Sequence, residues 1–397
     1  MSWIDDILEQ HSELESPAAF WRWSALSSIS AVLRDNVWLN KFAYKLYPNI
    51  YVMLHAESGL RKGPPVSMAK QLVKHVNNTK IISGRSSIQG ILKELGTAKS
   101  LPGGKIESVS AAFICSSELS SSLVEDKAVI KILTDLFDRN YNIDDWDSLL
   151  KSEKFSIKAP VVSMLSATNE AMSEDFLTKT AIQGGLIART FIINESVRQN
   201  INSLMFPLKT EINYEKSAEY LKELAKLRGE ILIDEVDRKF YDEWYHEFTA
   251  SRDSQEVIDV TGTLNRIDDA ILKVAILNSL SEQPELRITR TALEKSIQIC
   301  MELIGNVRRT TLGAGKSQWA TEKALIIRLL IDREGHAISR KMLNKQYWMR
   351  ASAEEWDEIM NQLSIAGIIE IMNIGNQVVF QMPDKIVEET RKHFGGK

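Results

Sequence analysis

The sequence predicts an α/β fold in which a parallel sheet follows N-terminal helices and precedes a helical lid and a C-terminal winged helix. Three observations predict it. Short apolar runs alternate with helical segments between about residues 37 and 196, which is typical of a largely parallel sheet. Helical periodicity then dominates residues 215–312. The last part of the chain has the order helix, helix, hairpin, which is that of a winged helix-turn-helix.

Length and composition indicate several globular domains. The 397 residues exceed what one small core organises, and the apolar share of 44% with a charged share of 26% argues against disorder. We expect an N-terminal helical segment at 1–36, a sheet domain at 37–212, a helical lid at 213–312 and a winged helix at 317–397.

Cysteine usage and hydropathy favour a cytoplasmic protein. Cys115 and Cys300 stand far apart in apolar stretches, which leaves no material for a disulfide framework or a thiolate metal site. No window approaches the roughly 20 apolar residues of a membrane span, and no basic segment leads into an apolar run at the N-terminus. We therefore expect no membrane contact.

The individual elements follow from spacing and breakers. Apolar residues at helical spacing predict two helices within about residues 3–33, the second beginning near Pro17. Strands are expected at 50–55, 80–83, 111–115, 161–166 and 190–193, and helices at 66–76, 87–95, 128–137 and 173–179. In the tail we expect a helix from 318, an extended piece at 337–338, helices at 339–348 and 352–366, and a hairpin of 368–371 with 377–380.

Residues 50–63 read as a strand, a turn of small residues, a lysine and then a helix. A phosphate loop needs this order, because backbone N–H groups and a helix N-terminus surround the phosphates while the lysine reaches the terminal ones. The match to GxxxxGK[ST] is partial, since Ala56, Arg61 and Gly63 replace the two glycines and the Ser or Thr. Taken alone, the segment leaves a nucleotide site and coincidence equally open. The expected nucleotide-binding residues are Ser58, Gly59, Arg61, Lys62 and Gly63.

Three polar residues at later strand boundaries raise the odds of a nucleotide site. Glu118 follows the strand 111–115 and is placed to polarise an attacking water, with Ser117 beside it as a weak magnesium ligand; the alternative for Glu118 is an acid at a helix start. Asn169 follows the third strand and senses the terminal phosphate, or is an ordinary turn residue. Arg189 is placed to reach a neighbouring subunit's nucleotide. We expect Lys62, Glu118, Asn169 and Arg189 along one rim of the sheet, the last three as catalytic residues.

These stretches resemble the helicase-like AAA+ ATPases of phages and mobile elements, many of them primase-associated. The resemblance covers about residues 47–305 and rests on YPNIY at 47–51, SGLRKG at 58–63, ISGRSSIQGIL at 82–92, SSEL at 116–119, SATN at 166–169, GGLIAR at 184–189 and LNR at 264–266. It implies a P-loop AAA+ sheet that binds ATP and Mg²⁺, with Arg266 as a second sensor arginine. Such proteins are similar to mini-chromosome-maintenance and superfamily-three helicases, which form hexamers around DNA and carry a basic hairpin in the pore.

DNA contact in this chain must be local, because the net charge is -4. Residues 148–158 alternate like a hairpin and match the pore hairpin, with Lys151 and Lys154 at its tip facing single-stranded DNA; a solvated hairpin is an equal alternative. In the winged helix, the third helix begins with four carboxylates within 352–358, which disfavours base reading. Docking of a replication or recombination protein is slightly favoured there.

The function predicted first is an ATPase, a hexameric ring motor that acts as a DNA helicase in the replication or mobilisation of a phage or mobile element. The alternative is a nucleotide-switched helicase loader or DNA-binding assembly factor with weak or no hydrolysis. A third hypothesis is a P-loop scaffold that binds no nucleotide and regulates DNA.

Overall fold

The computed structural model describes residues 2–83, 88–96, 110–117, 127–138, 145–150, 153–168, 185–254, 262–311, 320–347, 351–375 and 377–394. The predicted helix 173–179 and the predicted site residues Glu118, Lys151 and Asn169 lie outside these ranges. The chain divides into two compact units, Met1–Ile304 and Gly305–Lys397.

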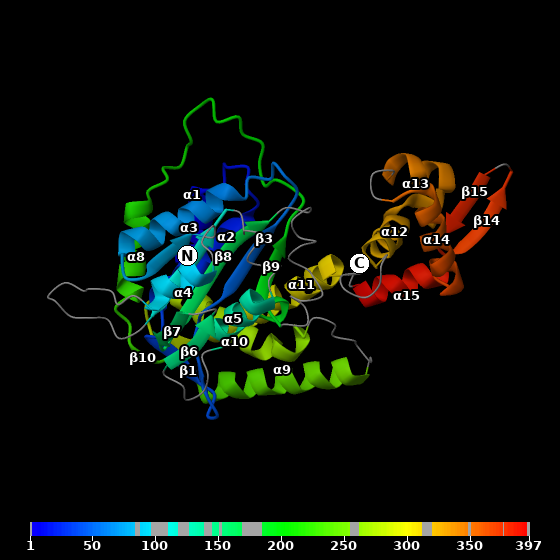
Figure 1. The fold of residues 1–397 in the computed structure, drawn as a ribbon. Helices are drawn as coiled ribbons and strands as arrows, with labels where there is room; N and C mark the ends of the chain where they lie inside the picture. The colour runs from blue at the N-terminus through cyan, green and yellow to red at the C-terminus, as the bar shows by residue number, and fades with distance from the viewer. Residues whose placement is uncertain are drawn as a thin grey trace. The chain divides into compact units, whose positions relative to one another are not determined.

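A five-stranded parallel sheet forms the centre of the first unit (Figure 1). In spatial order its strands are β4 (Lys80–Ser83), β5 (Ala111–Ser116), β8 (Val161–Thr168), β3 (Tyr51–His55) and β9 (Thr190–Asn194), and every neighbouring pair is parallel. The predicted α/β fold and its five strands are confirmed, with small shifts at the strand ends.

Helices cover both faces of the sheet, which explains why its strands are apolar without alternation. Val52 and Leu54 face the side of α2 (Ala18–Leu33) and α3 (Gly63–Val76) and share a core with them. On the other face, the hydroxyl of Tyr51 donates to the carbonyl oxygen of Leu133 at 3.0 Å, in α5 (Lys127–Phe137). α4 (Ile88–Gly96) follows β4 and packs against β7 (Glu153–Lys158), which forms a hairpin with β6 (Asp145–Leu150).

The two N-terminal helices are confirmed as α1 (Trp3–Gln10) and α2. A capping box between Ser2 and Asp5 starts α1. α2 is buried almost all round, and the hydroxyls of Ser27 and Ser28 donate to the carbonyl oxygens four residues earlier, so these polar groups remain hydrogen-bonded inside the protein.

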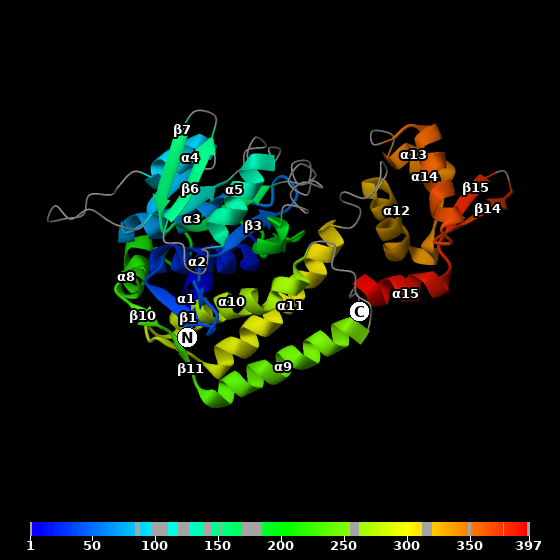
Figure 2. The ribbon, with the colours of Figure 1, turned by 60° about the horizontal axis from the view of Figure 1, so that its bottom comes forward.

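After the sheet come α8 (Tyr214–Leu224), α9 (Glu235–Ser254), α10 (Ile267–Glu282) and α11 (Arg290–Thr311) (Figures 1 and 2). The hydroxyl of Tyr241 in α9 donates to the carbonyl oxygen of Asp268 in α10 at 2.9 Å. Short strand pairs connect parts of this region with one another and with the segment that precedes the sheet. β1 (Val37–Asn40) pairs with β2 (Lys45–Leu46) and β10 (Gly229–Glu230), and β11 (Leu232–Ile233) pairs with β12 (Arg287–Ile288). One hydrophobic core runs from Trp3 through the sheet to Leu303, so the borders expected at residues 36 and 212 stay predictions.

The second unit holds α12 (Ala320–Asp332), β13 (Ala337–Ser339), α13 (Arg340–Tyr347), α14 (Ala353–Ile365), β14 (Glu370–Ile374), β15 (Gln377–Gln381) and α15 (Asp384–Phe394). Its strands form a small antiparallel sheet in the order β13-β15-β14, so the predicted hairpin is confirmed. Trp356 lies in a separate core of this unit. In the described part of either unit, no helix combines the length and apolar character that crossing a bilayer requires.

Candidate functional site

Lys62 lies in a loop at the carboxyl end of β3, where it caps the N-terminus of α3. Its Nζ donates to the carbonyl oxygens of Ala56 at 2.7 Å and Glu57 at 2.8 Å. The ammonium group therefore lies across its own loop, next to the point where the strand ends and the helix begins.

The backbone of this loop turns twice through left-handed conformations, at Gly59 (φ 94°) and Arg61 (φ 52°). Turns of this kind can form concave anion sites from successive N–H groups; in this loop the N–H group of Leu60 donates to the Glu57 carbonyl oxygen at 3.5 Å. Arg61 bears a conformational cost of about 1 kcal/mol that glycine would avoid. Two contacts hold it there: Ser16 Oγ donates to the Arg61 carbonyl oxygen at 2.7 Å, and the Arg61 Nε donates to Glu15 at 2.9 Å.

Two prolines reduce the number of free backbone N–H groups at the N-terminus of α3. α3 begins at Gly63 and continues with Pro64 and Pro65, neither of which has a backbone N–H. Two of the four N–H groups that a helix N-terminus offers are thus missing. This departure from a phosphate loop was not predicted from the sequence. The start of α3 therefore offers fewer N–H groups to an anion than a helix start without proline does.

The carboxyl ends of β5 and β8 lie at the same edge as the Lys62 loop. His55 pairs with Thr168 at the end of β8, and Ser116 pairs with Ser166 across β5 and β8. Ser117 is exposed directly after β5. Of the predicted site, the described residues Ser58, Gly59, Arg61, Lys62, Gly63 and Ser117 are therefore brought to one edge, and Glu118 and Asn169 follow the last described residues at that edge.

His55, which is buried, and Asn194, which is half-buried, form a polar pair that was not predicted from the sequence. The Nδ1 of His55 lies 2.9 Å from the Oδ1 of Asn194, across the ends of β3 and β9. The Nε2 of His55 is buried and has no hydrogen-bond partner within the described ranges. Because an unsatisfied buried nitrogen is costly, this position fits an additional polar group at the carboxyl edge.

Arg189 lies at the opposite edge, so its expected place on the rim of Lys62 is wrong. It precedes β9, whereas Lys62 follows β3, and the two strands are parallel. Its Nε donates to the Oδ2 of Asp138 at 2.9 Å, its Nη2 also donates to that oxygen, and its Nη1 donates to the Gly185 carbonyl oxygen at 2.8 Å. The side chain is only 8% exposed.

Arg266 lies beside Arg189. It ends the short 3₁₀ turn η3 (Leu264–Arg266) before α10, and its Nη1 is 3.6 Å from the Oδ1 of Asp138. Its side chain is 42% exposed. The structure thus brings the two predicted arginines together around Asp138, at the amino edge of the sheet. No motif marked Asp138, which follows the predicted helix 128–137 directly.

A buried lysine completes the amino edge. The Nζ of Lys273 in α10 donates to the Asn49 carbonyl oxygen and to its Oδ1, both at 2.9 Å, and lies 3.9 Å from the centre of the Phe137 ring. Asn49 in turn donates to the carbonyl oxygens of Phe137 and Val162. Burial lowers the pKa of Lys273 to about 7. This network joins α10 to the starts of β3 and β8.

The hairpin predicted at 148–158 is confirmed as β6 and β7, in which Lys154 pairs with Leu149. Lys151 lies outside the described residues. The proposed DNA contact of Lys151 and Lys154 therefore stays a prediction.

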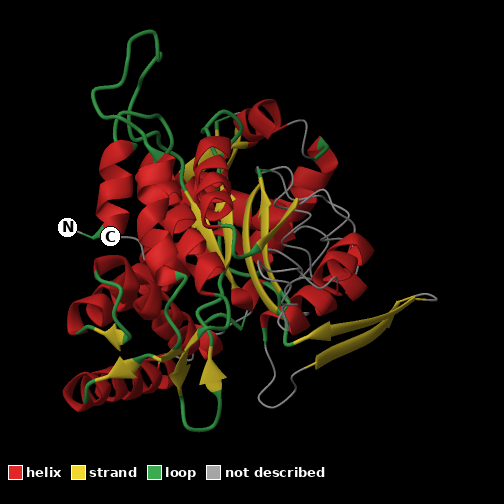
Figure 3. Ribbon diagram, turned by 90° about the vertical axis from the view of Figure 1, so that its left-hand side faces the viewer, coloured by secondary structure: helices red, strands yellow, loops and turns green. Residues whose placement is uncertain are grey.

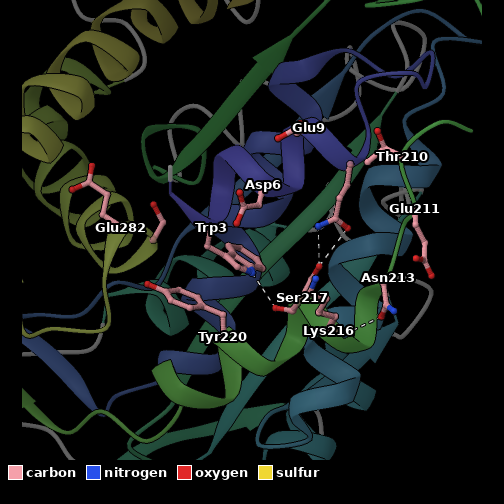
Figure 4. A pocket seen from close by; sticks show the side chains of 12 residues that line it. Trp3, Asp6, Glu9, Thr210, Glu211, Asn213, Lys216, Ser217, Tyr220 and Glu282 are labelled. Atoms are coloured by element: carbon pink, nitrogen blue, oxygen red, sulfur yellow. Dashed lines mark hydrogen bonds between the residues drawn. The ribbon is translucent and has the colours of Figure 1, made fainter.

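A cavity of about 610 Å³ lies between α1, α8 and the end of α10 (Figure 4). Four carboxylates, of Asp6, Glu9, Glu211 and Glu282, line it against one basic group, that of Lys216, among its described lining residues. Such a lining repels a triphosphate. The Lys62 loop is consequently the better anion site.

No model of a known protein family matches the chain, and no curated protein matches it significantly.

Proposed function

We propose that the chain is an AAA+ P-loop ATPase that works as a ring motor on DNA, helicase-like, in the replication or mobilisation of a phage or mobile element. The observation that carries the proposal is the Lys62 loop at the carboxyl end of β3, next to the ends of β8 and β5. Ligands of open parallel sheets bind outside the carboxyl ends of their strands.

The strand order supports a ligand at this edge. From β3 the chain leads through α3 to β4, beyond β8 and β5, whereas from β8 it leads to β9 on the other side of β3. The two connections run in opposite directions, which makes the ends of β3 and β8 a topological switch point, the usual binding position in such sheets.

Each residue at this edge has a separate role in the proposed hydrolysis of ATP. Lys62 and the loop N–H groups bind the terminal phosphates of ATP, Glu118 polarises the attacking water and Asn169 orients it. Magnesium, which neutralises phosphate charge when bound, is assigned to Ser117 and Glu118. The unpaired Nε2 of His55 provides one more polar contact at this edge.

Arg189 and Arg266 serve the nucleotide of a neighbouring subunit. They share Asp138 at the edge opposite Lys62, so they do not reach the phosphates held by the same chain. In a head-to-tail ring the amino edge of one copy meets the carboxyl edge of the next, where an arginine stabilises the charge of the transition state. Arg266 then acts between subunits and not within its own chain.

Mixing two inactive variants tests this assignment. We expect Lys62→Ala and Arg266→Ala each to lose ATP turnover, and an equimolar mixture to recover a quarter or so of it, because a junction then combines an intact Lys62 with an intact Arg266. Arg266 suits the test because its side chain is half-exposed and its removal costs little stability. A mixture as inactive as its components would place both residues in one chain's site.

In the second unit we assign a winged helix that docks a partner protein. The start of α14 carries Glu354, Glu355, Asp357 and Glu358, which repel phosphates. The Nε of Arg340 in α13 donates to Asp357 at 2.7 Å, so part of the basic charge of that helix is already neutralised. Both features favour a protein partner over DNA for this unit.

The full chain with ATP, magnesium and DNA tests the function. We expect ATP turnover that single-stranded DNA stimulates several-fold, and unwinding of a forked duplex. ATP-dependent DNA binding without unwinding would instead support the loader hypothesis, for which the two prolines at the start of α3 and Ser117 give a structural reason. Absence of any ATP binding would overturn both.

A further inference from the structure

The backbone of Arg61 is left-handed at the position where the phosphate-loop template has glycine. Its φ is 52°, and it directly precedes Lys62. A residue with a Cβ atom populates this region about fivefold less than glycine does. Because Lys62 is the next residue, a change in the Arg61 backbone would redirect the lysine and alter the loop around it. The loop therefore needs contacts from outside to keep Arg61 in this conformation.

Two such contacts come from the connection between α1 and α2. The Oγ of Ser16, a residue only 1% exposed, donates to the carbonyl oxygen of Arg61 at 2.7 Å. The carboxylate of Glu15 accepts a hydrogen bond from the Nε of Arg61 at 2.9 Å. That hydrogen bond is the main cause that lowers the pKa of the Glu15 carboxyl, which is therefore charged at neutral pH. One contact thus fixes the backbone of Arg61 and the other its side chain.

The connection between α1 and α2 is itself held by several contacts. The Nε1 of Trp21 in α2 donates to the carbonyl oxygen of Ser16 at 3.2 Å, and the Trp21 ring stacks on His11 with 4.1 Å between the ring centres. From the segment after β9, the Nε2 of Gln199 donates to the carbonyl oxygens of His11 at 2.7 Å and Leu14 at 3.0 Å. Fixed supporting residues are what keeps a binding site in its productive geometry.

The segment between β9 and α8, residues 195–213, also contacts Glu15. This segment extends beyond the helices of the first unit as a long loop (Figures 1 and 3). The Nη1 of Arg198 donates to one carboxylate oxygen of Glu15 at 2.9 Å, while the Nε of Arg61 donates to the other. The side chain of Glu15 is 12% exposed. Its carboxylate is thus fixed by a second arginine in the position from which it holds the first.

We propose that Ser16 and Glu15 are positioning residues for ATP, which hold Arg61 in its left-handed conformation and so keep the Lys62 loop in the shape that binds the phosphates. This role rests on the proposed function, since it presumes a nucleotide at the Lys62 loop. The side chain of Arg61 is then engaged by Glu15, and only its backbone belongs to the binding loop. The α1–α2 connection becomes part of the nucleotide site, although 45 residues separate Ser16 from Arg61.

Two substitutions at position 61 separate the backbone of Arg61 from its side chain, with the affinity of the full chain for a fluorescent ATP analogue as the measurement. Arg61→Ala loses the contact with Glu15 and keeps the conformational cost, so we expect the affinity to fall about fivefold. Arg61→Gly loses the same contact but removes the cost, so it should bind within about twofold of the parent chain. Equal losses in both variants would assign the guanidinium to the phosphates and overturn the proposal.

Removal of both supporting side chains tests them directly. The variant Glu15→Ala/Ser16→Ala should bind the analogue about tenfold more weakly than the parent, because each lost hydrogen bond is worth roughly two- to tenfold. In the Arg61→Gly chain the same double substitution should cost no more than about twofold, since glycine adopts the left-handed region without support. A cost that is equal in the two chains, or a gain of affinity in the double variant, overturns the proposal.

Glu13→Ala is the matched control. Glu13 lies in the same connection and accepts hydrogen bonds from the N–H groups of Lys209 at 2.8 Å and Thr210 at 3.1 Å, so its loss leaves both contacts of Arg61 in place and ATP affinity unchanged. Urea unfolding without ATP gives a second readout, in which the double substitution should lower stability more in the parent than in Arg61→Gly. A parent that binds no ATP overturns the proposed function. The urea comparison then decides alone, and equal losses in it overturn the positioning of the loop as well.

Discussion

Replacement of Lys62 by alanine is expected to abolish ATP turnover and to lower ATP affinity about a thousandfold. An ammonium group about 4 Å from a phosphate charge contributes roughly 4 kcal/mol near a protein surface, and each 1.4 kcal/mol is a factor of about ten in affinity. The effect is large here because Pro64 and Pro65 have no backbone N–H groups, which would otherwise also bind the phosphates. Titration with a fluorescent ATP analogue, and phosphate release, measure the two quantities.

Lys62 also stabilises the loop through its two hydrogen bonds, so the effect of its charge on ATP must be distinguished from its effect on loop structure. Lys62→Gln keeps a donor for the carbonyl oxygens of Ala56 and Glu57 but removes the charge, and it should lose ATP binding nearly as fully as alanine does. Lys74→Ala, at an exposed position in the last turn of the same helix, should leave binding unchanged. Binding that survives in Lys62→Gln would assign the lysine to loop structure.

The periodicity of apolar residues and the positions of glycine and proline were sufficient to predict the sheet and most helices. β3, β5 and β8 are buried on both faces and therefore read as uninterrupted apolar runs, while Gly375 and its neighbours marked the turn of the C-terminal hairpin. Pairs such as β11 with β12 span two residues each and show no period, so only tertiary contact defines them. For the same reason the sequence could not show that α10 and α11 share a hydrophobic core with the sheet.

The candidate site was predictable where chain order fixes the position. Lys62 and Ser117 follow strands, and in a parallel sheet every residue that follows a strand lies at the carboxyl edge. The same rule would have placed Arg189, which precedes its strand, at the amino edge, and would have marked His55 as a polar residue at a strand end. Asp138 and Asn49 act through contacts with residues distant in sequence, and no local pattern marks them.

Lys273 should make the stability of the folded chain rise with pH above neutrality. Burial is the main cause that lowers its pKa to about 7; Arg189 and Arg266 add to the lowering, against the attraction of Asp269 and Asp138. In the unfolded chain the pKa returns to about 10.4, so between pH 7 and 10.4 the unfolded state binds a proton that the folded state has lost. Stability then rises by up to about 1.4 kcal/mol per pH unit.

The prediction concerns the difference between the parent chain and Lys273→Met, followed by urea unfolding from pH 6 to 8.5. Methionine removes the titration but leaves both Asn49 oxygens without the lysine donor, so a constant offset of about 1 to 3 kcal/mol is expected. Against that offset, the parent should gain roughly 1.5 kcal/mol on the variant between pH 7 and 8.5. Burial also raises the pKa of Cys115 to about 12, so thiol ionisation in the unfolded state destabilises both chains above pH 8.5 but cancels in their difference. Lys239→Met, at an exposed position on α9, should show no such slope. A flat difference for Lys273→Met would mean that the lysine keeps its proton throughout, stabilised by Asn49 and the face of the Phe137 ring.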